Sequence, residues 1–309
     1  CLVDGSVAVA KRFRMSEFLI GITIVGIGTS MPELVTSLAG SLQDKGDIAI
    51  GNVIGSNIAN TFLIRGATAL IRPIIIERST LRFDIPFNIL ISVVLLVMCF
   101  GFMFWLPGTK ESIGRGEAAI LLGMFVFYMI YSFRTSPKTP EPVAIESDEK
   151  PKKTIPVWLA CLMIAGGLAA LIFGGRLFVS GAVRIAVALG VKESVIAITI
   201  LAIGTSLPEL ATSVVAAIKK NTQLALGNII GSNISNITLI LGVSGLARPL
   251  TIGSIAVTDL YMLVLASLVL LISVFTFRKW TLDRYEGIIF LLIYISYIRI
   301  LVYKDAPIS

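Results

Sequence analysis

Histidine is missing from the chain of 309 residues, and cysteine occurs only three times. Without histidine, the protein lacks the commonest general base, proton shuttle and metal ligand. Cys1, Cys99 and Cys161 show no metal-ligand or redox spacing, and the two internal ones lie in apolar runs where cysteine behaves as a small hydrophobic residue. We therefore assign the cysteines no functional role, and we expect no bound cofactor.

Charged residues are also scarce. They make up 15% of the chain, whereas hydrophobic residues make up 56%, and the mean hydropathy is +0.91. Soluble domains contain about 45–50% apolar residues, so the lipid bilayer is the expected partner of this chain. Apolar stretches of about 20 residues can cross roughly 30 Å of hydrocarbon as helices, and the alternating pattern of an outer-membrane barrel is absent. The sequence predicts an all-α membrane protein.

Apolar runs between charged, proline or glycine residues predict ten membrane-spanning helices in two groups of five. The first group comprises a shortened helix that ends near Ala10 and the runs Ser16–Leu42, Asp47–Ile71, Phe83–Trp105 and Ile113–Phe133. The second group comprises the runs Ile155–Val187, Glu193–Ile218, Leu224–Ala247, Val257–Phe277 and Asp283–Val302. Residues 134–154 carry four prolines and alternating charge, which is typical of a solvated linker. We therefore divide the chain into residues 1–133, a linker at 134–154 and residues 155–309.

The first predicted helix is too short to span a membrane. In the second group, the stretch that matches Leu2–Ala10 is the end of a long apolar run that begins near Ile155. A spanning helix needs about 20 residues. We therefore expect about one to two dozen residues to precede Cys1 in the intact protein.

An internal repeat relates the two groups. The tract Gly-Thr-Ser-Met-Pro-Glu-Leu at Gly28–Leu34 recurs as Gly-Thr-Ser-Leu-Pro-Glu-Leu at Gly204–Leu210, 176 residues later. Each copy is followed at identical spacing by Gly-Asn-x-Ile-Gly-Ser-Asn-x-x-Asn, which ends at Asn60 and Asn236. The chain is therefore two copies of one unit. Because each unit has five crossings, an odd number, the second must enter the membrane from the opposite side, and the repeats are predicted to be inverted.

The distribution of lysine and arginine predicts the orientation. Sixteen of them fall on the predicted loops of one side and seven on the other. Since positive residues accumulate on the cytoplasmic side, the linker should be cytoplasmic and both termini outside. This loop bias also explains the net charge of +7, so we expect no nucleic-acid partner. No obligate protein partner is evident in the sequence.

Two glutamates lie inside predicted spans, at matching positions of the repeats. A carboxylate in the bilayer is energetically costly, so Glu33 and Glu209 are candidate functional residues. Pro32 and Pro208 precede them and prevent regular helical bonding, which frees backbone carbonyls at this depth. Broken helices at paired positions are the best sequence indication of a transporter's binding site.

Further polar residues of the two motifs share a helix face with this candidate site. Thr29 lies four residues before Glu33, as Thr205 lies before Glu209, and Ser30 and Ser206 complete the hydroxyl-rich tracts. The same spacing places Ser56 with Asn60 and Ser232 with Asn236 on one face. Small-residue helix packing explains the nearby glycines. A second set of asparagines could be ligands or could bond the broken helix backbone: Asn52, Asn57, Asn228 and Asn233.

All of these side chains offer hard oxygen donors, without thiolate or imidazole. Such donors suit Ca²⁺, Mg²⁺, Mn²⁺ or Na⁺ and argue against Zn²⁺ or Cu⁺. Ca²⁺ takes about 6–8 oxygens, and its double charge neutralises a carboxylate pair. Mg²⁺ fits less well because it dehydrates reluctantly. The substrate is therefore expected to be a hard cation.

With these motifs, both halves resemble the alpha-repeats of the sodium/calcium exchangers in the cation/calcium antiporter superfamily. The resemblance covers about residues 20–66 and 196–242 directly. It implies that Glu33, Glu209, Thr29 and Thr205 bind Ca²⁺. It also implies flanking sodium sites that share the glutamates and add the following groups: Ser56, Ser232 and backbone carbonyls near Gly26 and Ala202.

The sequence departs from the family pattern at two points. Members often have one Asn and one Asp at the positions of Asn60 and Asn236, whereas both are Asn here, which leaves the exchange ratio open. Arg65 lies in an apolar run, and its counterpart is Leu241. The sequence alone does not assign a role to this arginine.

The resemblance implies secondary antiport of Ca²⁺ against Na⁺ by alternating access, in the plasma (inner) membrane of a prokaryote. An antiporter that couples Ca²⁺ or another divalent cation to protons on the same fold is the nearest alternative. An intramembrane hydrolase that uses the two glutamates as acid and base is a remote one, since no nucleophile–base pair or zinc ligands are recognisable. We expect a transporter and not an enzyme.

Overall fold

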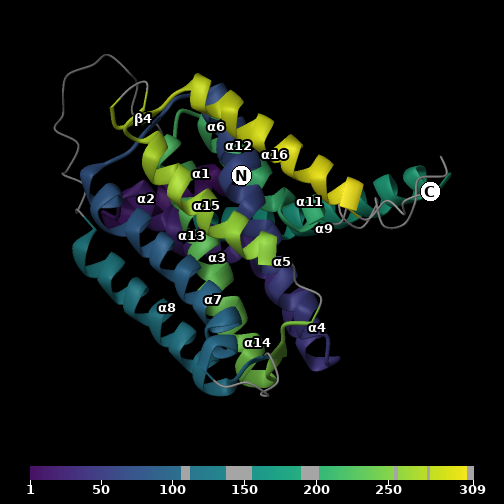
Figure 1. Cartoon of the computed structure of the whole chain (residues 1–309). Helices are drawn as coiled ribbons and strands as arrows, with labels where there is room; N and C mark the ends of the chain where they lie inside the picture. Colours follow the sequence, from purple (N-terminus) through teal and green to yellow (C-terminus); the bar gives the residue numbers. More distant parts are fainter. Residues whose placement is uncertain (106–111, 137–154, 189–201, 254–256, 277–278, 305–309) are drawn as a thin grey trace, which may run out of the picture.

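The computed structural model describes residues 1–105, 112–136, 155–188, 202–253, 257–276 and 279–304 (Figure 1). Most of these residues are helical, as predicted. The first half contains, in order, α1 (Leu2–Phe13), α2 (Glu17–Ile20), π-helix η1 (Gly21–Val25), α3 (Gly26–Thr29), α4 (Met31–Leu42), α5 (Gly46–Ala59), π-helix η2 (Asn60–Ile64), α6 (Arg65–Ile71), β1 (Ile74–Ile75), π-helix η3 (Thr80–Asp84), α7 (Ile85–Trp105), β2 (Ser112–Ile113) and α8 (Arg115–Thr135).

The second half follows a similar order. Its elements are α9 (Val157–Ala188), α11 (Ala202–Thr205), α12 (Leu207–Ile218), α13 (Thr222–Ser235), π-helix η5 (Asn236–Ile240), α14 (Leu241–Ala247), β3 (Leu250–Thr251), α15 (Val257–Ser273), β4 (Thr281–Leu282) and α16 (Arg284–Lys304). Residues 137–154 of the predicted linker lie outside the described residues, and Arg134 and Thr135 belong to α8.

Within the described residues, four helical segments are long and apolar enough to cross a membrane. They are Thr80–Cys99, Arg115–Thr135, Val157–Ala188 and Thr222–Ala247. A fifth is obtained when the bent pair Glu17–Thr29 and Met31–Leu42 is taken as one span. The described helix bounds follow the predicted apolar runs closely, and residues 193–201 of the predicted run Glu193–Ile218 lie outside the described residues. Fewer than the ten expected spans meet these length and hydropathy criteria.

Short strands join loops at each end of the helical core. β1 pairs antiparallel with β4, and β2 pairs antiparallel with β3. The continuous segment from α5 to α6 begins against β3, where Gly46 contacts the backbone of Leu250 and Thr251, and ends just before β1. The equivalent segment from α13 to α14 begins near β1, since Gln223 Nε2 donates to the Ile75 carbonyl at 2.9 Å, and ends just before β3. These two equivalent segments therefore run in opposite directions.

Glycines allow the helices at the centre to approach closely. α13 is buried over most of its length and packs against α2, η1 and α3. A Cβ on Gly21 would lie 2.6 Å from the Leu224 carbonyl oxygen, and one on Gly231 would lie 2.5 Å from Ile22 Cα. The sequence predicts close helix packing at Gly51, Gly55, Gly227 and Gly231, and the structure shows it for Gly227 and Gly231. The prediction is wrong for Gly51 and Gly55, because no described atom lies within 4 Å of a Cβ at either position.

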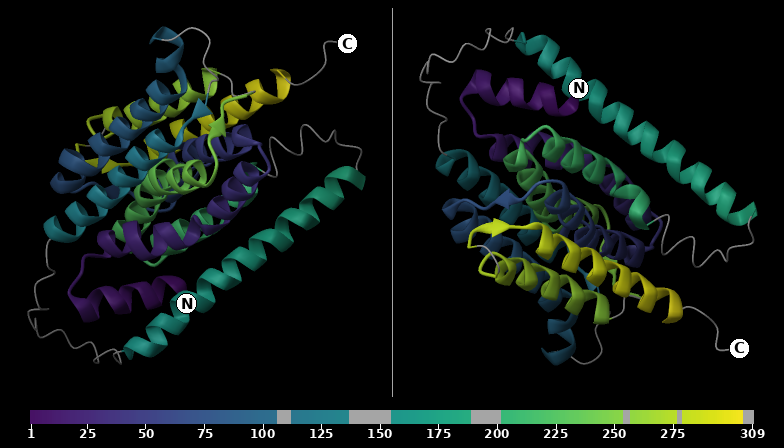
Figure 2. Two further views of the ribbon diagram at one scale, coloured as in Figure 1. Left: turned by 90° about the horizontal axis from the view of Figure 1, so that it is seen from below. Right: turned by 90° about the horizontal axis from the view of Figure 1, so that it is seen from above.

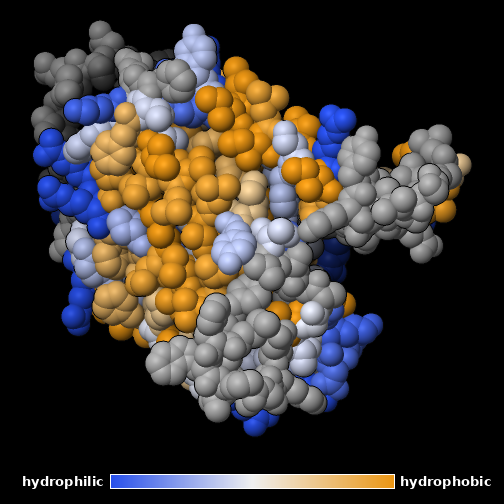
Figure 3. All heavy atoms as spheres, in the orientation of Figure 1, coloured by the Kyte–Doolittle hydropathy of each residue, from blue (hydrophilic) through white to orange (hydrophobic). Residues whose placement is uncertain are grey.

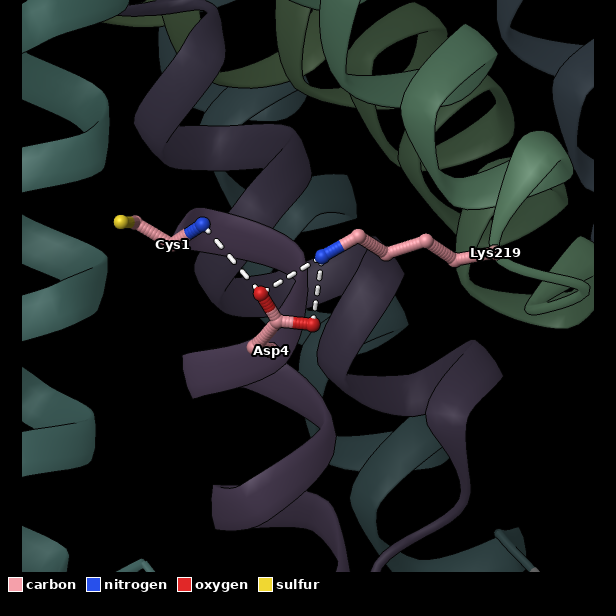
Figure 4. A network of polar contacts seen from close by, with 3 residues as sticks. All are labelled: Cys1, Asp4 and Lys219. Atoms are coloured by element: carbon pink, nitrogen blue, oxygen red, sulfur yellow. Dashed lines mark hydrogen bonds and ion pairs between the residues drawn. The ribbon is translucent and has the colours of Figure 1, made fainter.

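Two helices lie at the edge of the molecule. α1 and α9 run side by side, apart from most of the other helices (Figure 2). Asp4 on α1 also accepts hydrogen bonds from Lys219 Nζ, 2.6 Å from each carboxylate oxygen, and from the Cys1 nitrogen at 3.3 Å (Figure 4). This exposed contact ties the first helix to the end of α12 in the second half.

A broad apolar surface extends over α7 and α15, with hydrophilic residues gathered at its edges (Figure 3). Its exposed side chains include Leu90, Val93 and Val97 on α7 and Leu265, Leu268 and Ile272 on α15. A surface of this kind is costly in water but suits contact with acyl chains. The surface is consistent with the membrane protein that the composition predicts.

Candidate ion-binding site

The predicted helix breaks are present in both halves. Ser30 separates α3 from α4, and Ser206 separates α11 from α12, with φ and ψ of −82° and 6° at Ser30 and −86° and 6° at Ser206. In each case a proline occupies the first turn of the following helix, where its missing N–H is tolerated. The first break bends the chain by 46°. The carboxyl-bearing residues, Glu33 and Glu209, therefore lie in the first turn after a break.

The two glutamates are brought together from opposite halves. Glu33 is 0% and Glu209 is 1% exposed, and two ionised carboxylates at this centre would repel each other. Ser30 Oγ donates to Glu209 Oε1 at 3.1 Å, and Ser206 Oγ donates to Glu33 Oε1 at 3.5 Å. Each serine thus bonds the carboxylate of the other half. This crosswise pairing forms one shared polar centre rather than two separate sites.

Hydroxyl and carbonyl groups near Gly26 extend this centre. Thr29 Oγ1 donates to Asn228 Oδ1 at 3.2 Å and lies 3.4 Å from the Gly26 carbonyl oxygen. Ser232 Oγ donates to the same carbonyl at 3.2 Å. The structure therefore places Gly26, Thr29 and Ser232 in direct contact. On the other side, Thr205 ends α11 and Ala202 begins it, and the Ala202 side chain lies outside the described residues.

Two asparagines hold the broken helices in place. Asn52 Nδ2 donates to the Glu33 backbone carbonyl at 3.3 Å and to Ser37 Oγ at 3.1 Å. Asn228 Nδ2 donates in the same way to the Glu209 carbonyl at 3.3 Å and to Ser213 Oγ at 2.9 Å. These amide nitrogens bond the broken backbone, one of the two roles that the sequence left open. The serines that support them were not identified from the sequence, although both fall on matching repeat positions.

The second motif also links the halves. Asn57 Nδ2 donates to the Asn233 carbonyl at 3.0 Å, and Asn236 Nδ2 donates to Asn57 Oδ1 at 2.9 Å. Asn233 Nδ2 donates to Thr61 Oγ1 at 3.1 Å. Asn60 differs from its counterpart Asn236, because neither its amide oxygen nor its nitrogen has a described partner. The repeat is therefore symmetric in sequence here but not in hydrogen bonding.

Several candidate residues present a buried oxygen without a described hydrogen-bond partner. These atoms are Glu33 Oε2, Glu209 Oε2, Thr205 Oγ1, Ser56 Oγ, Asn60 Oδ1 and Asn236 Oδ1. Burying an unpaired polar atom is unfavourable, and most buried polar groups in proteins are paired. A hard cation would satisfy such oxygens directly. Among the described residues, no cluster of three or more His, Cys, Asp or Glu side chains suits a metal, so this centre depends on two carboxylates and neutral oxygens.

Arg65 follows directly after π-helix η2, in the segment that carries Ser56 and Asn60. Its side chain is 0% exposed, and none of its three guanidinium nitrogens has a hydrogen-bond partner among the described residues. Its counterpart Leu241 is part of the hydrophobic core. The structure therefore buries a permanent positive charge on a helix that contributes to the candidate site.

Comparisons with known proteins agree over nearly the whole chain. Residues 1–134 and 159–303 match the family described as sodium/calcium exchanger protein. CaxA of Alkalimonas amylolytica is 38% identical over 299 residues, which cover 96% of this chain and 91% of that protein. The sodium/calcium exchanger MaX1 of Methanosarcina acetivorans is 32% identical over 331 residues, with coverages of 97% and 93%.

A solved structure shows the same similarity in three dimensions. The sodium-calcium exchanger NCX_Mj, soaked with zero Na⁺ and Ca²⁺, superposes on this chain with a TM-score of 0.79 at 33% identity. The match covers 97% of this chain and 92% of that one. The resemblance that the two motifs indicate thus extends to the helices outside them.

Proposed function

Because the chain belongs to the sodium/calcium exchanger protein family, we propose that it is an integral membrane antiporter that exchanges Ca²⁺ for Na⁺. The pair of buried carboxylates, each with one oxygen lacking a donor and each bonded by a serine of the other half, is the observation that supports this most strongly. The pair offers a doubly negative centre that a divalent cation neutralises. On this proposal the protein is a transporter and not an enzyme, and Ca²⁺ and Na⁺ are its substrates.

The proposed architecture has ten transmembrane helices in two inverted five-helix repeats, at residues 1–133 and 155–309. The opposite directions of the α5–α6 and α13–α14 segments support the inversion. Contacts between loops also agree with the two predicted sides: β1 pairs with β4, and Asp44 forms an ion pair with Arg248. We assign the β1–β4 end, with the linker at 134–154, to the cytoplasm, and the termini to the outside of a prokaryotic inner membrane.

For the ligands we propose the roles that the family resemblance implies. Glu33, Glu209, Thr29 and Thr205 bind Ca²⁺, and Ser30 and Ser206 support the carboxylates from the opposite half. Sodium uses the same glutamates together with a wider set of groups: Ser56, Ser232, Asn60, Asn236 and the carbonyls of Gly26 and Ala202. Sodium and calcium would then compete for shared oxygens, which makes simultaneous occupancy unfavourable.

The transport mechanism follows from the charge of the site. Alternating access exposes the glutamate pair to one side at a time, and the peripheral helices α1 and α9 slide across the core to make the change. An empty site would carry two unpaired carboxylates through the bilayer, at a cost of several kcal/mol each. Occupancy by Ca²⁺ or Na⁺ removes this cost. Leak and uniport are therefore suppressed, and exchange is obligatory.

Calcium uptake into sodium-loaded liposomes tests the proposal. Glu33→Gln and Glu209→Gln should each lower ⁴⁵Ca²⁺ uptake at least about tenfold, since loss of more than about 1.4 kcal/mol of ion binding has that effect. Glu77→Gln, a change at an exposed loop residue, is the matched control and should retain uptake. Equal uptake by all variants would overturn the site assignment.

The ion gradient that drives calcium uptake distinguishes sodium coupling from the alternative, proton coupling. Liposomes without sodium but with a pH gradient should show no calcium uptake, whereas a sodium gradient at equal pH should drive it. Uptake driven by the pH gradient alone would favour exchange of Ca²⁺ for protons on the same glutamates.

A further inference from the structure

Arg65 is a charged side chain in the described core whose burial no hydrogen bond or ion pair accounts for. The guanidinium cannot lose its proton at physiological pH, and a buried charge without a partner is strongly unfavourable. All three of its nitrogens are buried and lack a described hydrogen-bond partner. The equivalent position holds Leu241, so the fold itself does not require a cation there. The arginine must therefore gain an anionic partner in some state of the protein to offset its burial.

The π-helix η2 determines the direction of Arg65. Its backbone N–H donates to the carbonyl of Asn60, five residues earlier. In an α-helix the residue above Asn60 would be Ile64, but the wider π turn brings Arg65 to the Asn60 face instead. Side chains on a helix lean toward its N-terminus, which directs the guanidinium toward Asn60 rather than away from it. The arginine therefore lies one turn beyond the candidate site, on the same face.

The buried acids of the described residues narrow the choice of partner. Asp84 accepts a hydrogen bond from Tyr128 at 2.9 Å, and Glu286 accepts from Thr276 at 3.0 Å and from the Asp283 N–H at 2.9 Å. Glu33 and Glu209 each keep one carboxylate oxygen without a donor.

Glu209 is favoured over Glu33 by packing. Its helix, α12, packs directly against α6 and η2. Thr212, one turn after Glu209, is 2% exposed and also has a hydroxyl without a described partner. The amide of Asn60, on the segment that leads to Arg65, likewise has no described partner. The two packed segments therefore carry buried polar groups that a guanidinium can satisfy.

We propose that Arg65 is a tethered cation of the ion site, which pairs with Glu209 when calcium leaves and takes the place of one sodium ion. The inference rests on the proposed sodium/calcium exchange. The two carboxylates and Arg65 together carry one negative charge, so one Ca²⁺ or two Na⁺ give the same loaded charge of one positive unit. A third Na⁺ would add a further buried positive charge. The exchange ratio is therefore two Na⁺ for one Ca²⁺, without net charge movement.

Replacement of Arg65 by leucine, the residue at the equivalent position 241, removes this constraint. Three Na⁺ on two carboxylates again leave one positive unit, the charge that the wild-type site already accepts. In liposomes at zero membrane potential, a tenfold sodium gradient should sustain about a 100-fold calcium gradient for the wild type and about a 1000-fold gradient for Arg65→Leu. Calcium movement should respond to membrane potential only in the variant. Arg65→Lys keeps the charge and should retain the wild-type ratio.

The outcomes separate this inference from the proposed function. Equal gradients for the wild type and Arg65→Leu, with only a change in thermal stability, would show that Arg65 has a structural role and would overturn the inference. If Arg65→Leu fails to fold, the wild-type measurement is sufficient as a test. A 1000-fold calcium gradient sustained by the wild type would also overturn the inference. Absence of sodium-driven calcium movement in folded wild-type protein would instead reject the proposed function, and the inference with it.

Discussion

At the scale of single residues, the site depends on side chains that bridge the two halves. Asn228 is the most connected of them, since its nitrogen bonds the Glu209 carbonyl and Ser213 while its oxygen accepts from Thr29. Asn52 makes the matching bonds through its nitrogen, to the Glu33 carbonyl and Ser37. The bond from Thr29 makes Asn228 a link between the first broken helix and the second half.

This difference predicts unequal effects of two matched substitutions. Asn228→Ala removes three hydrogen bonds among buried groups, and we expect a loss of about 1–3 kcal/mol in stability. Asn52→Ala should cost less, because Asn52 is only partly buried. The midpoint temperature of thermal unfolding in detergent measures the stability loss of each variant. Equal shifts for the two variants would contradict the bridging role of Asn228.

The positions of the glutamates could be predicted from the sequence, whereas their hydrogen bonds could not. The sequence shows directly that each glutamate lies in an apolar run beside a proline, and the repetition 176 residues later strengthens the assignment. The crosswise bonds of Ser30 to Glu209 and of Ser206 to Glu33 depend on how the halves cross in space. The same holds for Asn60 and Asn236, whose matching sequence positions acquire different partners.

At the scale of elements, the helix breaks were predictable but the π-helices were not. Pro32 and Pro208 mark the breaks because proline cannot bond as a regular helical residue does. A π turn shifts hydrogen bonding by one residue and leaves the apolar pattern nearly unchanged, so η2 and η5 have no comparable sequence marker. Their equivalent positions nevertheless show that the shift is a property of the repeat.

The close packing of η1 on α13 leads to a prediction at this scale. A Cβ on Gly231 would lie within 2.6 Å of the Ile22 carbonyl oxygen and 2.5 Å of its Cα, both in the backbone, so the helices would have to separate. We expect Gly231→Ala to destabilise the protein by about 1–3 kcal/mol and to impair calcium uptake, because Ser232 would move away from the Gly26 carbonyl.

Gly123→Ala on α8 provides the matched control, since no atom of the described residues lies within 4 Å of a Cβ there. Alanine is about 1 kcal/mol better than glycine in a helix, so the control should be neutral or stabilising. Thermal unfolding and uptake assays on both variants measure the difference. A Gly231→Ala variant as stable and active as the control would show that η1 and α13 can separate without cost.

At the scale of the whole molecule, described loops that the lysine and arginine pattern assigns to one side contact each other. The loop with Arg78 meets the loop with Trp280, where the guanidinium lies 4.8 Å from the ring centroid, and the two loops are also joined by β1 and β4. At the other end, Asp44 pairs with Arg248 and β2 pairs with β3. The two-residue strands themselves could not be predicted, because so short a segment carries no periodic signal.

This sorting predicts which residues an impermeant reagent can reach. Lys45 lies beside β3 and Arg72 lies beside β1, so a cysteine at each position reports on one end of the molecule. In a background without Cys1, Cys99 and Cys161, an impermeant maleimide added to intact cells should label Lys45→Cys and leave Arg72→Cys unlabelled. After the membrane is permeabilised, both should react, because both positions are exposed. Labelling of Arg72→Cys in intact cells would reverse the proposed orientation, and labelling of both would place the two ends on one side, which an inverted pair of repeats does not allow.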